Sequence, residues 1–153
     1  KATVRMKHLD EVRLMTAIIR DEGAVIEDGL HKMYKDHLGY WTIGYGKLVD
    51  PEAGGGLTEH EAQFLLKNTL SDMWDELQSS LPWIVEKHEE VQEALLNMCY
   101  NLGITRLLKF KKMLAAIEAD NPDEAYAQAL DSKWARQVGQ RAQRIADIFK
   151  AEL

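Results

Sequence analysis

Residues 18–46 read IIRDEGAVIEDGLHKMYKDHLGYWTIGYG, and the interpretation of the whole chain starts from this stretch. It begins with the end of an amphipathic helix that closes on an acid, Glu22, and Gly23 is the residue type expected just past a helix C-terminus. Residues 34–46 predict a β-hairpin, because large and small side chains alternate after a His-Leu-Gly turn at 37–39. The pattern therefore indicates a carboxyl group at a helix end that faces a hairpin.

The hairpin adds a second acid, Asp36, and a hydroxyl, Thr42, to the helix acid. Hydrolysis of a glycosidic bond needs one carboxyl group to protonate the leaving oxygen and another to handle the carbocation or the attacking water. The competing interpretations are an exposed helix-end glutamate, a turn-capping aspartate and a threonine that simply favours a strand. Both kinds of interpretation stay open for Asp36, since Asp-His-Leu-Gly is also a favourable turn sequence.

The stretch resembles the phage-type lysozymes, the endolysin muramidases of glycoside hydrolase family 24 typified by the T-even phages. The resemblance rests on RDEG at 20–23, YKD at 34–36 and GYWTIGYG at 39–46, and it returns at 132–134, 137, 139 and 141–144. It implies that Glu22 is the general acid, that Asp36 orients and activates the water, and that Thr42 holds this water by its hydroxyl. The two acids are about five residues further apart than in the family, so residues 24–32 form an added loop, expected at the mouth of the site with a turn at 27–29.

The resemblance also assigns supporting and substrate-binding positions. Arg141 matches the family arginine that pairs with the catalytic glutamate and tethers the lobes. Gln137, Trp134 and Asn101 match a packed polar group behind the cleft, although pure core packing is an alternative for Trp134. The family's substrate contacts fall on Leu48, Tyr100, Met113 and Gln128. The family usually has phenylalanine at the position of Tyr100, and Met113 and Gln128 also differ from the family in residue type.

The expected fold is α+β and mostly α, with a small β-hairpin lobe and a helical lobe joined by a long helix. Residues 1–153 would form a single lysozyme domain, in which about 24–57 make the hairpin lobe and about 58–80 the connecting helix. The helical lobe would comprise about 81–153 plus 9–22. A capping box at 58–61 should open the connecting helix after a loop at 47–57, and Asp10 should cap the first helix. Further helices are predicted over 88–102, 105–109, 110–119, 121–130 and 140–151.

Composition restricts the possible partners. The chain of 153 residues is 46% hydrophobic and 29% charged, which is ordinary for a globular protein. No apolar run approaches the roughly 20 residues of a membrane span. A net charge of −6 argues against nucleic acid and against long-range attraction to an anionic cell wall. Lys109, Lys111 and Lys112 are candidates for a local basic face, with a solvated helix edge as the alternative.

Metal and thiol chemistry are not indicated by the sequence. The single Cys99 excludes an internal disulfide, and its apolar surroundings predict a buried thiol rather than a nucleophile. The five histidines lack paired ligand spacing, so neither a metal nor an organic cofactor is expected.

The resemblance implies hydrolysis, with inversion, of the β-1,4 bond between N-acetylmuramic acid and N-acetylglucosamine in peptidoglycan. The expected protein is a monomer made in the host bacterial cytoplasm that acts on the wall in the periplasm. No signal peptide is visible in the chain, so a holin or a fused module would deliver it. Two alternatives remain, a lytic transglycosylase on the same scaffold and a catalytically silent wall-binding or tail module. The intact acid–acid–hydroxyl set argues against both.

Overall fold

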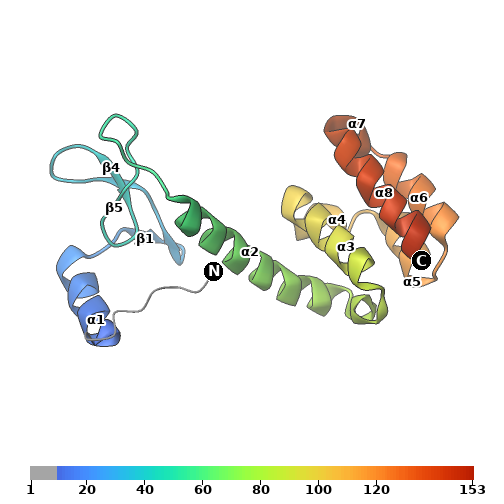
Figure 1. The fold of residues 1–153 in the computed structure, drawn as a ribbon, viewed down its shortest axis with the longest axis horizontal. Coiled ribbons are helices and arrows are strands. Elements are labelled where there is room, and N and C mark those ends of the chain that lie inside the picture. The colour runs from blue at the N-terminus through green and yellow to red at the C-terminus, as the bar shows by residue number, and fades with distance from the viewer. Residues whose placement is uncertain (1–9) are drawn as a thin grey trace. The chain divides into compact units, whose positions relative to one another are not determined.

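The structure, a computed structural model, describes residues 10–153 and has the predicted α+β, mostly helical architecture (Figure 1). The chain divides into two compact units, of which the first ends at residue 62 and the second covers residues 63–153. All strands of the described chain belong to the first unit. The division of residues 1–153 into the predicted lobes, including the assignment of 9–22 to the helical lobe, stays a prediction.

The first helix ends where the sequence indicated. Helix α1 (Glu11–Glu22) is capped by Asp10, whose side chain accepts a hydrogen bond from the N–H of Arg13 at 2.9 Å. At the other end, Gly23 has φ 65° and donates its N–H to the carbonyl of Ile19 at 3.0 Å. Because a residue with a side chain is strained at this φ, glycine is the residue that lets the chain leave the helix directly after Glu22.

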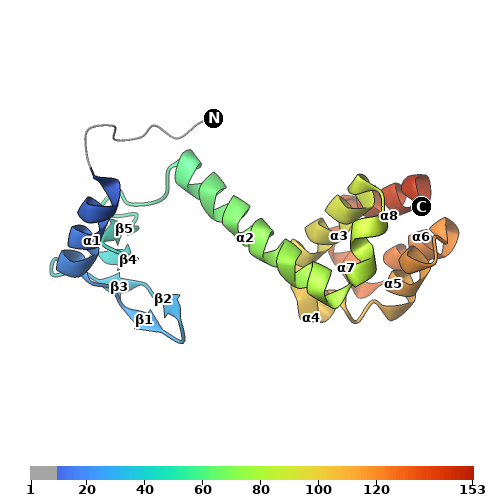
Figure 2. The same ribbon diagram turned by 90° about the horizontal axis from the view of Figure 1, so that it is seen from below.

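The added segment forms a hairpin of its own. Strand β1 (Ile26–Glu27) pairs antiparallel with β2 (Leu30–His31), and Figure 2 shows the two strands as a separate ribbon. The turn between them has Asp28 at φ 52° and Gly29 at φ 76°, as in the two-residue turns that suit a hairpin. The predicted turn is therefore confirmed, whereas the strands that flank it were not indicated by the sequence.

The main hairpin is the start of a three-stranded antiparallel sheet. Its strands are β3 (Tyr34–Lys35), β4 (Trp41–Ile43) and β5 (Lys47–Leu48), in the order β3-β4-β5. Thr42 lies on the central strand, opposite Tyr34 on one side and Leu48 on the other.

The predicted extent of the second hairpin arm was wrong. The strand stops at Ile43, because Gly44 and Gly46 have φ values of 64° and 88° and turn the chain back. Lys47 and Leu48, predicted to begin a loop, form the third strand instead. This turn brings Leu48 beside Thr42, so the correction changes which side chains lie next to the central hydroxyl.

The long helix α2 (Glu59–Ser80) opens with the predicted capping box. Thr58 accepts a hydrogen bond from the N–H of Glu61, and the Glu61 carboxylate accepts one from the N–H of Thr58, both at 3.1 Å. The same carboxylate pairs with the Lys47 ammonium at 2.9 Å and so joins β5 to the start of the helix. The Lys47 hydrogen bond, followed by those from Thr58, lowers the pKa of Glu61 from 4.5 to about 2.

We expect this carboxylate to make the first unit sensitive to acid. A pKa that is lowered on folding contributes stability that is present above pH 4.5 and is lost as the pH falls towards about 2. The wild-type protein should therefore lose more unfolding free energy between these pH values than Glu61→Gln, by a small amount because the pair is exposed. Chemical denaturation at a series of pH values measures the difference. Glu52→Gln, an exposed loop acid, is the control and should follow the wild-type profile.

The second unit is a helical bundle around one apolar core. Its helices after α2 are α3 (Glu89–Leu102), α4 (Ile104–Leu107), α5 (Lys111–Glu118), α6 (Pro122–Leu130), α7 (Lys133–Val138) and α8 (Gln140–Glu152), with a 3₁₀ turn at Pro82–Glu86. Helix α6 packs against α5 and α8, and α3 packs against α8. The largest fully buried side chains include Phe149, Leu95, Met98, Leu107 and Ile117.

Most of the predicted helices of this unit are confirmed, with small shifts at their ends. The helix predicted over 105–109 begins one residue earlier, directly after Gly103, and ends at Leu107. Helix α7 was not indicated by the apolar spacing because it is a short helix; Ser132 caps it by accepting from the N–H of Ala135 at 3.0 Å. Cys99 is fully buried as predicted, and burial, with a smaller contribution from the charge of Glu76, raises the pKa of its thiol.

Within residues 10–153, no helix combines the length and the apolar character that crossing a bilayer would require.

Candidate active site

A hollow of about 690 Å³ in the first unit brings the predicted catalytic residues together. Glu22, Asp36 and Thr42 line it, and so does Leu48, one of the predicted substrate contacts. The remaining lining residues are Tyr34, Lys35, His37, Leu38, Tyr40, Gly46 and Ala53. The added segment 24–32, expected at the mouth of the site, contributes no residue to this lining. The β1–β2 hairpin contacts the rest of the unit through the ring of His31, which lies edge-on to the ring of Tyr45.

Asp36 builds the turn that separates the first two strands of the sheet. Its Oδ1 accepts hydrogen bonds from the N–H groups of Leu38 and Tyr40, both at 2.9 Å. Asp36 therefore caps the turn, as one of the two interpretations predicted, and it does so through Oδ1. Its Oδ2 has no hydrogen-bond partner among residues 10–153 and is left for another group. The side chain is half-buried, and two backbone donors fix its orientation.

Thr42 is buried at the centre of the sheet, with an exposed fraction of 4%. Its hydroxyl donates to the carbonyl of Tyr40 at 3.1 Å, which uses the one hydrogen of the group. The oxygen keeps a lone pair that can accept a hydrogen bond from a water molecule in the hollow. Both polar side chains of the hairpin are thus oriented by backbone groups of the same turn.

Glu22 ends α1 beside Gly46, a residue that the sequence did not single out. A Cβ at Gly46 would lie 3.0 Å from Oε2 of Glu22 and 3.3 Å from its Cδ, closer than most Cβ contacts. The absence of a side chain at Gly46 is therefore what leaves room for the glutamate carboxylate. A sequence signal was present in the Gly-Tyr-Gly run at 44–46, but only the fold shows which glycine meets the acid.

Asp50 accepts a hydrogen bond from the central strand and was also not singled out by the sequence. Its exposed fraction is 8%, and its Oδ2 accepts from the N–H of Trp41 at 3.1 Å, next to Thr42. Its Oδ1 accepts from the N–H of Glu52 at 3.0 Å and closes the loop that follows β5. Asp-Pro after a strand is a turn signal, which indicates a local role but gives no hint of the bond to Trp41.

The predicted supporting residues lie in the second unit. The Nε1 of Trp134 donates to the side chain of Asn101 at 2.7 Å, and this tryptophan is 3% exposed. Arg141 donates through Nε to the side-chain oxygen of Asn97 at 2.8 Å, while Gln137 is exposed. The supporting roles of these residues, and the pairing of Arg141 with Glu22, stay predictions.

The remaining substrate-contact positions are also in the second unit. Tyr100 is 46% exposed on α3. Met113 is 1% exposed and lines, together with Gln128, a second hollow at the start of α5. Their contacts with a substrate stay predictions, as does the contact of Leu48.

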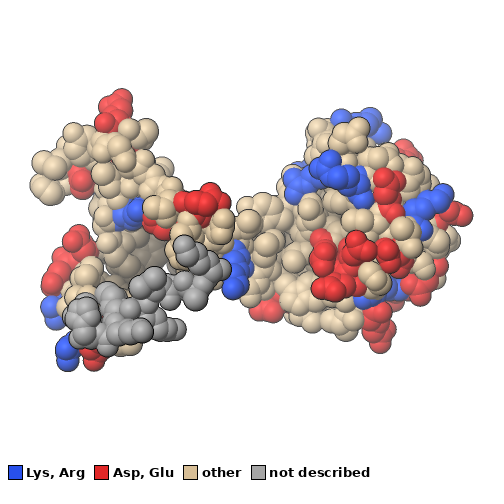
Figure 3. All heavy atoms as spheres, viewed as in Figure 1, with Lys and Arg blue, Asp and Glu red and all other residues tan. Residues whose placement is uncertain are grey.

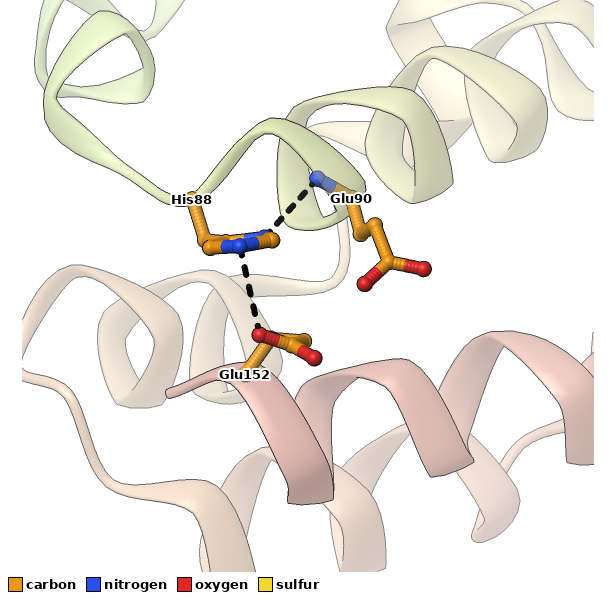
Figure 4. A group of neighbouring side chains, drawn as sticks. All are labelled: His88, Glu90 and Glu152. Atoms are coloured by element: carbon orange, nitrogen blue, oxygen red, sulfur yellow. Dashed lines mark hydrogen bonds and ion pairs between the residues drawn. The ribbon is translucent and has the colours of Figure 1, made fainter.

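One group of side chains in the second unit has the composition of a metal site. The ligand atoms of His88, Glu90 and Glu152 lie within 4.8 Å of one another (Figure 4). However, Nδ1 of His88 accepts a hydrogen bond from the N–H of Glu90 at 3.1 Å, so the neutral ring carries its proton on Nε2, which lies 3.4 Å from Glu152. A metal on Nε2 would require the proton to move and would break the bond that caps α3. The chemistry of this group fits a contact between α3 and the end of α8 better than a metal site.

Comparison with known proteins identifies the family. The model of the family described as Phage lysozyme matches residues 26–148. Probable T4-type lysozyme 1 of Dictyostelium discoideum is 26% identical over an alignment of length 156. The alignment covers 85% of this chain and 89% of that protein. The pre-baseplate central spike protein Gp5 of Enterobacteria phage T4 is 30% identical over 85% of this chain, but the chain spans only 26% of the spike protein's length. Because the family match covers most of its length, the chain belongs to the phage lysozyme family and is a glycoside hydrolase of the lysozyme class.

Proposed function

We propose that this lysozyme hydrolyses, with inversion, the β-1,4 bond between N-acetylmuramic acid and N-acetylglucosamine in peptidoglycan. The observation that supports the proposal is the common hollow of Glu22, Asp36 and Thr42, and among residues 10–153 the two carboxyl groups that line it are those of Glu22 and Asp36. Two carboxyl groups and one water are sufficient for inverting hydrolysis. The family membership supports the class of substrate.

In the proposed mechanism, Glu22 gives its proton to the glycosidic oxygen as the bond from that oxygen to the anomeric carbon breaks. Asp36 takes a proton from a water through its unpartnered Oδ2, and the water oxygen forms the new bond to the anomeric carbon from the opposite face. The Thr42 oxygen accepts a hydrogen bond from the water's other O–H, which stays on the product, and so orients the water. The proton lost by Glu22 and the proton gained by Asp36 are restored by exchange with solvent, which completes the cycle.

Product analysis tests this chemistry directly. Digestion of purified peptidoglycan should give N-acetylmuramic acid with a free reducing end, and proton NMR during the first turnovers should show the α-anomer before mutarotation. A 1,6-anhydromuramic end would overturn hydrolysis and favour the lytic transglycosylase, since that reaction needs no water. The β-anomer appearing first would retain hydrolysis but overturn inversion.

We also propose that the protein acts as a monomer on the cell wall and reaches it through a holin or as part of a larger assembly. The match to a protein named as a baseplate spike supports the second route. Light scattering during gel filtration tests the monomer, and a stable dimer at micromolar concentration would contradict it.

Delivery by a holin is tested in host cells that express the protein with and without one. This route predicts lysis only when both proteins are present.

The contact between Gly46 and Glu22 predicts that activity depends on where the Glu22 carboxylate lies. Gly46→Ala should lower kcat by up to about ten-fold, because the added Cβ displaces the Glu22 carboxylate by a few tenths of an ångström and the rate depends steeply on the position of the reacting groups. Gly44→Ala is the matched control: Gly44 also has a positive φ, 64°, but a Cβ there meets nothing within 4 Å. Both changes should destabilise the fold by about 1–2 kcal/mol through backbone strain. Release of reducing ends well below the melting temperature measures the activities, and equal activities would show that the contact does not position Glu22.

A further inference from the structure

Asp50 is a buried carboxylate that the proposed mechanism does not use. It and Thr42 are the two polar side chains that are buried within residues 10–153, with exposed fractions of 8% and 4%. The other acids of this range are exposed or partly exposed, and Figure 3 shows many of them at the surface. A buried carboxylate is costly unless its oxygens are compensated, so the partners of these oxygens indicate what the side chain does.

The two carboxylate oxygens of Asp50 hold different parts of the first unit. Oδ1 accepts from the N–H of Glu52 at 3.0 Å, two residues further along the chain, which is the bond of an Asx turn. Oδ2 accepts from the N–H of Trp41 at 3.1 Å, nine residues away on the central strand. The first bond accounts for the turn after β5, whereas the second is not needed for that turn.

A bulge in the sheet places Asp50 opposite Trp41. The N–H groups of Val49 and Asp50 both donate to the carbonyl of Trp41, at 2.9 and 3.0 Å, so two residues oppose one. Gly55 packs against this backbone: its N–H donates to the Asp50 carbonyl at 2.7 Å, and a Cβ there would lie 2.7 Å from the Asp50 nitrogen. These contacts fix the backbone of Asp50 and thereby the direction of its carboxylate.

The N–H that Oδ2 binds belongs to the peptide group that orients the hydroxyl in the active-site hollow. This planar group joins the carbonyl of Tyr40 to the N–H of Trp41. Its oxygen accepts from the hydroxyl of Thr42 at 3.1 Å and from the N–H of Asp36 at 2.9 Å. Because the group is rigid, a carboxylate that fixes its N–H also fixes the direction of its oxygen. A hydrogen bond to a charged acceptor is strong and also polarises the bonds on the other side of the peptide.

We propose that Asp50 is a positioning residue of the reaction, which acts through the Tyr40–Trp41 peptide on the hydroxyl of Thr42. The inference rests on the proposed function, in which this hydroxyl orients the attacking water. Loss of the carboxylate lets the peptide rotate and displaces the hydroxyl, so the chemical step slows while substrate binding is unchanged. A smaller part of the effect passes through the N–H of Asp36, which the same carbonyl oxygen holds.

A double-mutant cycle in kcat provides the first test. Asp50→Ala should lower kcat about ten-fold and change KM by less than about two-fold, because the rate depends steeply on the position of the reacting groups. Thr42→Val removes the hydroxyl and keeps the shape of the side chain. In this background Asp50→Ala should lower kcat by no more than about two-fold, since interacting residues are not additive. Equal factors in the two backgrounds would overturn the inference, because a purely structural role does not depend on the hydroxyl.

Asn121→Ala is the matched control for the loss of a side-chain acceptor. Asn121 accepts from the N–H of Glu124 at 3.3 Å, but it caps α6 in the second unit and does not line the active-site hollow. The control should keep the kcat of its parent in both backgrounds, with all rates measured well below the melting temperatures.

Amide hydrogen exchange, measured by NMR on the whole protein, provides a second test that requires no activity. The N–H of Asp36 should exchange several-fold faster in Asp50→Ala, because the Tyr40 oxygen that it binds is no longer held in place. The N–H of Lys32, which donates to the Val25 carbonyl at 2.9 Å in the same unit, should exchange at the wild-type rate. Equal acceleration of both amides would show that the whole unit is destabilised and would overturn the inference.

Asp50→Asn keeps the inference testable where the alanine variant does not fold. Its carbonyl oxygen can take the place of Oδ1 or of Oδ2 but not of both, so either Glu52 or Trp41 loses its acceptor. The kcat should fall only if the N–H of Trp41 exchanges faster than in the wild type. A low kcat with a protected Trp41 amide, or a wild-type kcat with an unprotected one, would contradict the inference. If the wild type released no reducing ends from peptidoglycan, the proposed function would fail, whereas exchange of the Asp36 amide would still report on the peptide.

Discussion

Replacing Glu22 with glutamine is expected to abolish the release of reducing ends from peptidoglycan, with kcat lower by about 10²–10⁴-fold. Glutamine has the same shape, so it can occupy the space beside Gly46, but its amide cannot supply the proton that the leaving oxygen needs. The loss should therefore appear in kcat with little change in KM. Unfolding should be unaffected, because Glu22 is exposed and lies at the end of α1.

Asp21→Asn is the matched control for this change. Asp21 precedes Glu22 on the same helix end, is exposed and pairs with Arg20 at 3.1 Å, but it does not line the hollow. The control should retain full activity, because exposed ion pairs of this kind contribute little. If Glu22→Gln cleared cell walls as fast as Asp21→Asn, the residue would not be the acid and the hollow would not be the active site.

The helix ends of this protein could be predicted from the sequence because their chemistry is local. Asp10 and Thr58 accept N–H bonds within three residues, and Gly23 takes the φ that other residues avoid. Each of these effects depends on the identity of a few neighbouring residues, which the sequence states directly. The same is true of the Asp28–Gly29 turn in the added segment.

The sheet could be predicted only in part because strand pairing is not local. The sequence pattern of 34–46 predicted one hairpin, but the pairing of Lys47 and Leu48 with β4 depends on the return of the chain at Gly44 and Gly46. A two-residue strand is too short to show an alternating pattern. Strands β1 and β2 were not predicted for the same reason, because each has two residues.

The candidate site shows the same division between local and distant effects. Sequence motifs indicated Glu22, Asp36 and Thr42, and the structure places all three around one hollow. Gly46 and Asp50 were not indicated, because their importance lies in contacts with residues that are distant in the chain, Glu22 and Trp41. A motif records residue types and spacing, whereas these contacts exist only after the sheet and α1 have formed.

Asp36 is the residue for which substitution can separate structure from chemistry. Asp36→Asn should lower kcat at least about 10²-fold, because an amide cannot take the proton of the attacking water. Its free energy of unfolding should change by no more than about 0.5 kcal/mol. The asparagine oxygen can still accept the N–H bonds of Leu38 and Tyr40, so the turn that holds the hairpin remains intact.

Asp36→Ala removes both functions and completes the comparison. Its kcat should fall as far as that of the asparagine variant. Its free energy of unfolding should be lower than that of the asparagine variant by about 1–2 kcal/mol, because two hydrogen bonds are lost. Urea denaturation and the release of reducing ends measure the two quantities on the same samples. An asparagine variant that kept full activity would limit Asp36 to its turn, and a reaction that needs one carboxyl group, with anhydromuramic products, would then explain the site better than inverting hydrolysis. Because Oδ1 is occupied by the backbone and Oδ2 is not, we expect both variants to lose activity: one oxygen builds the turn and the other is left to meet the water.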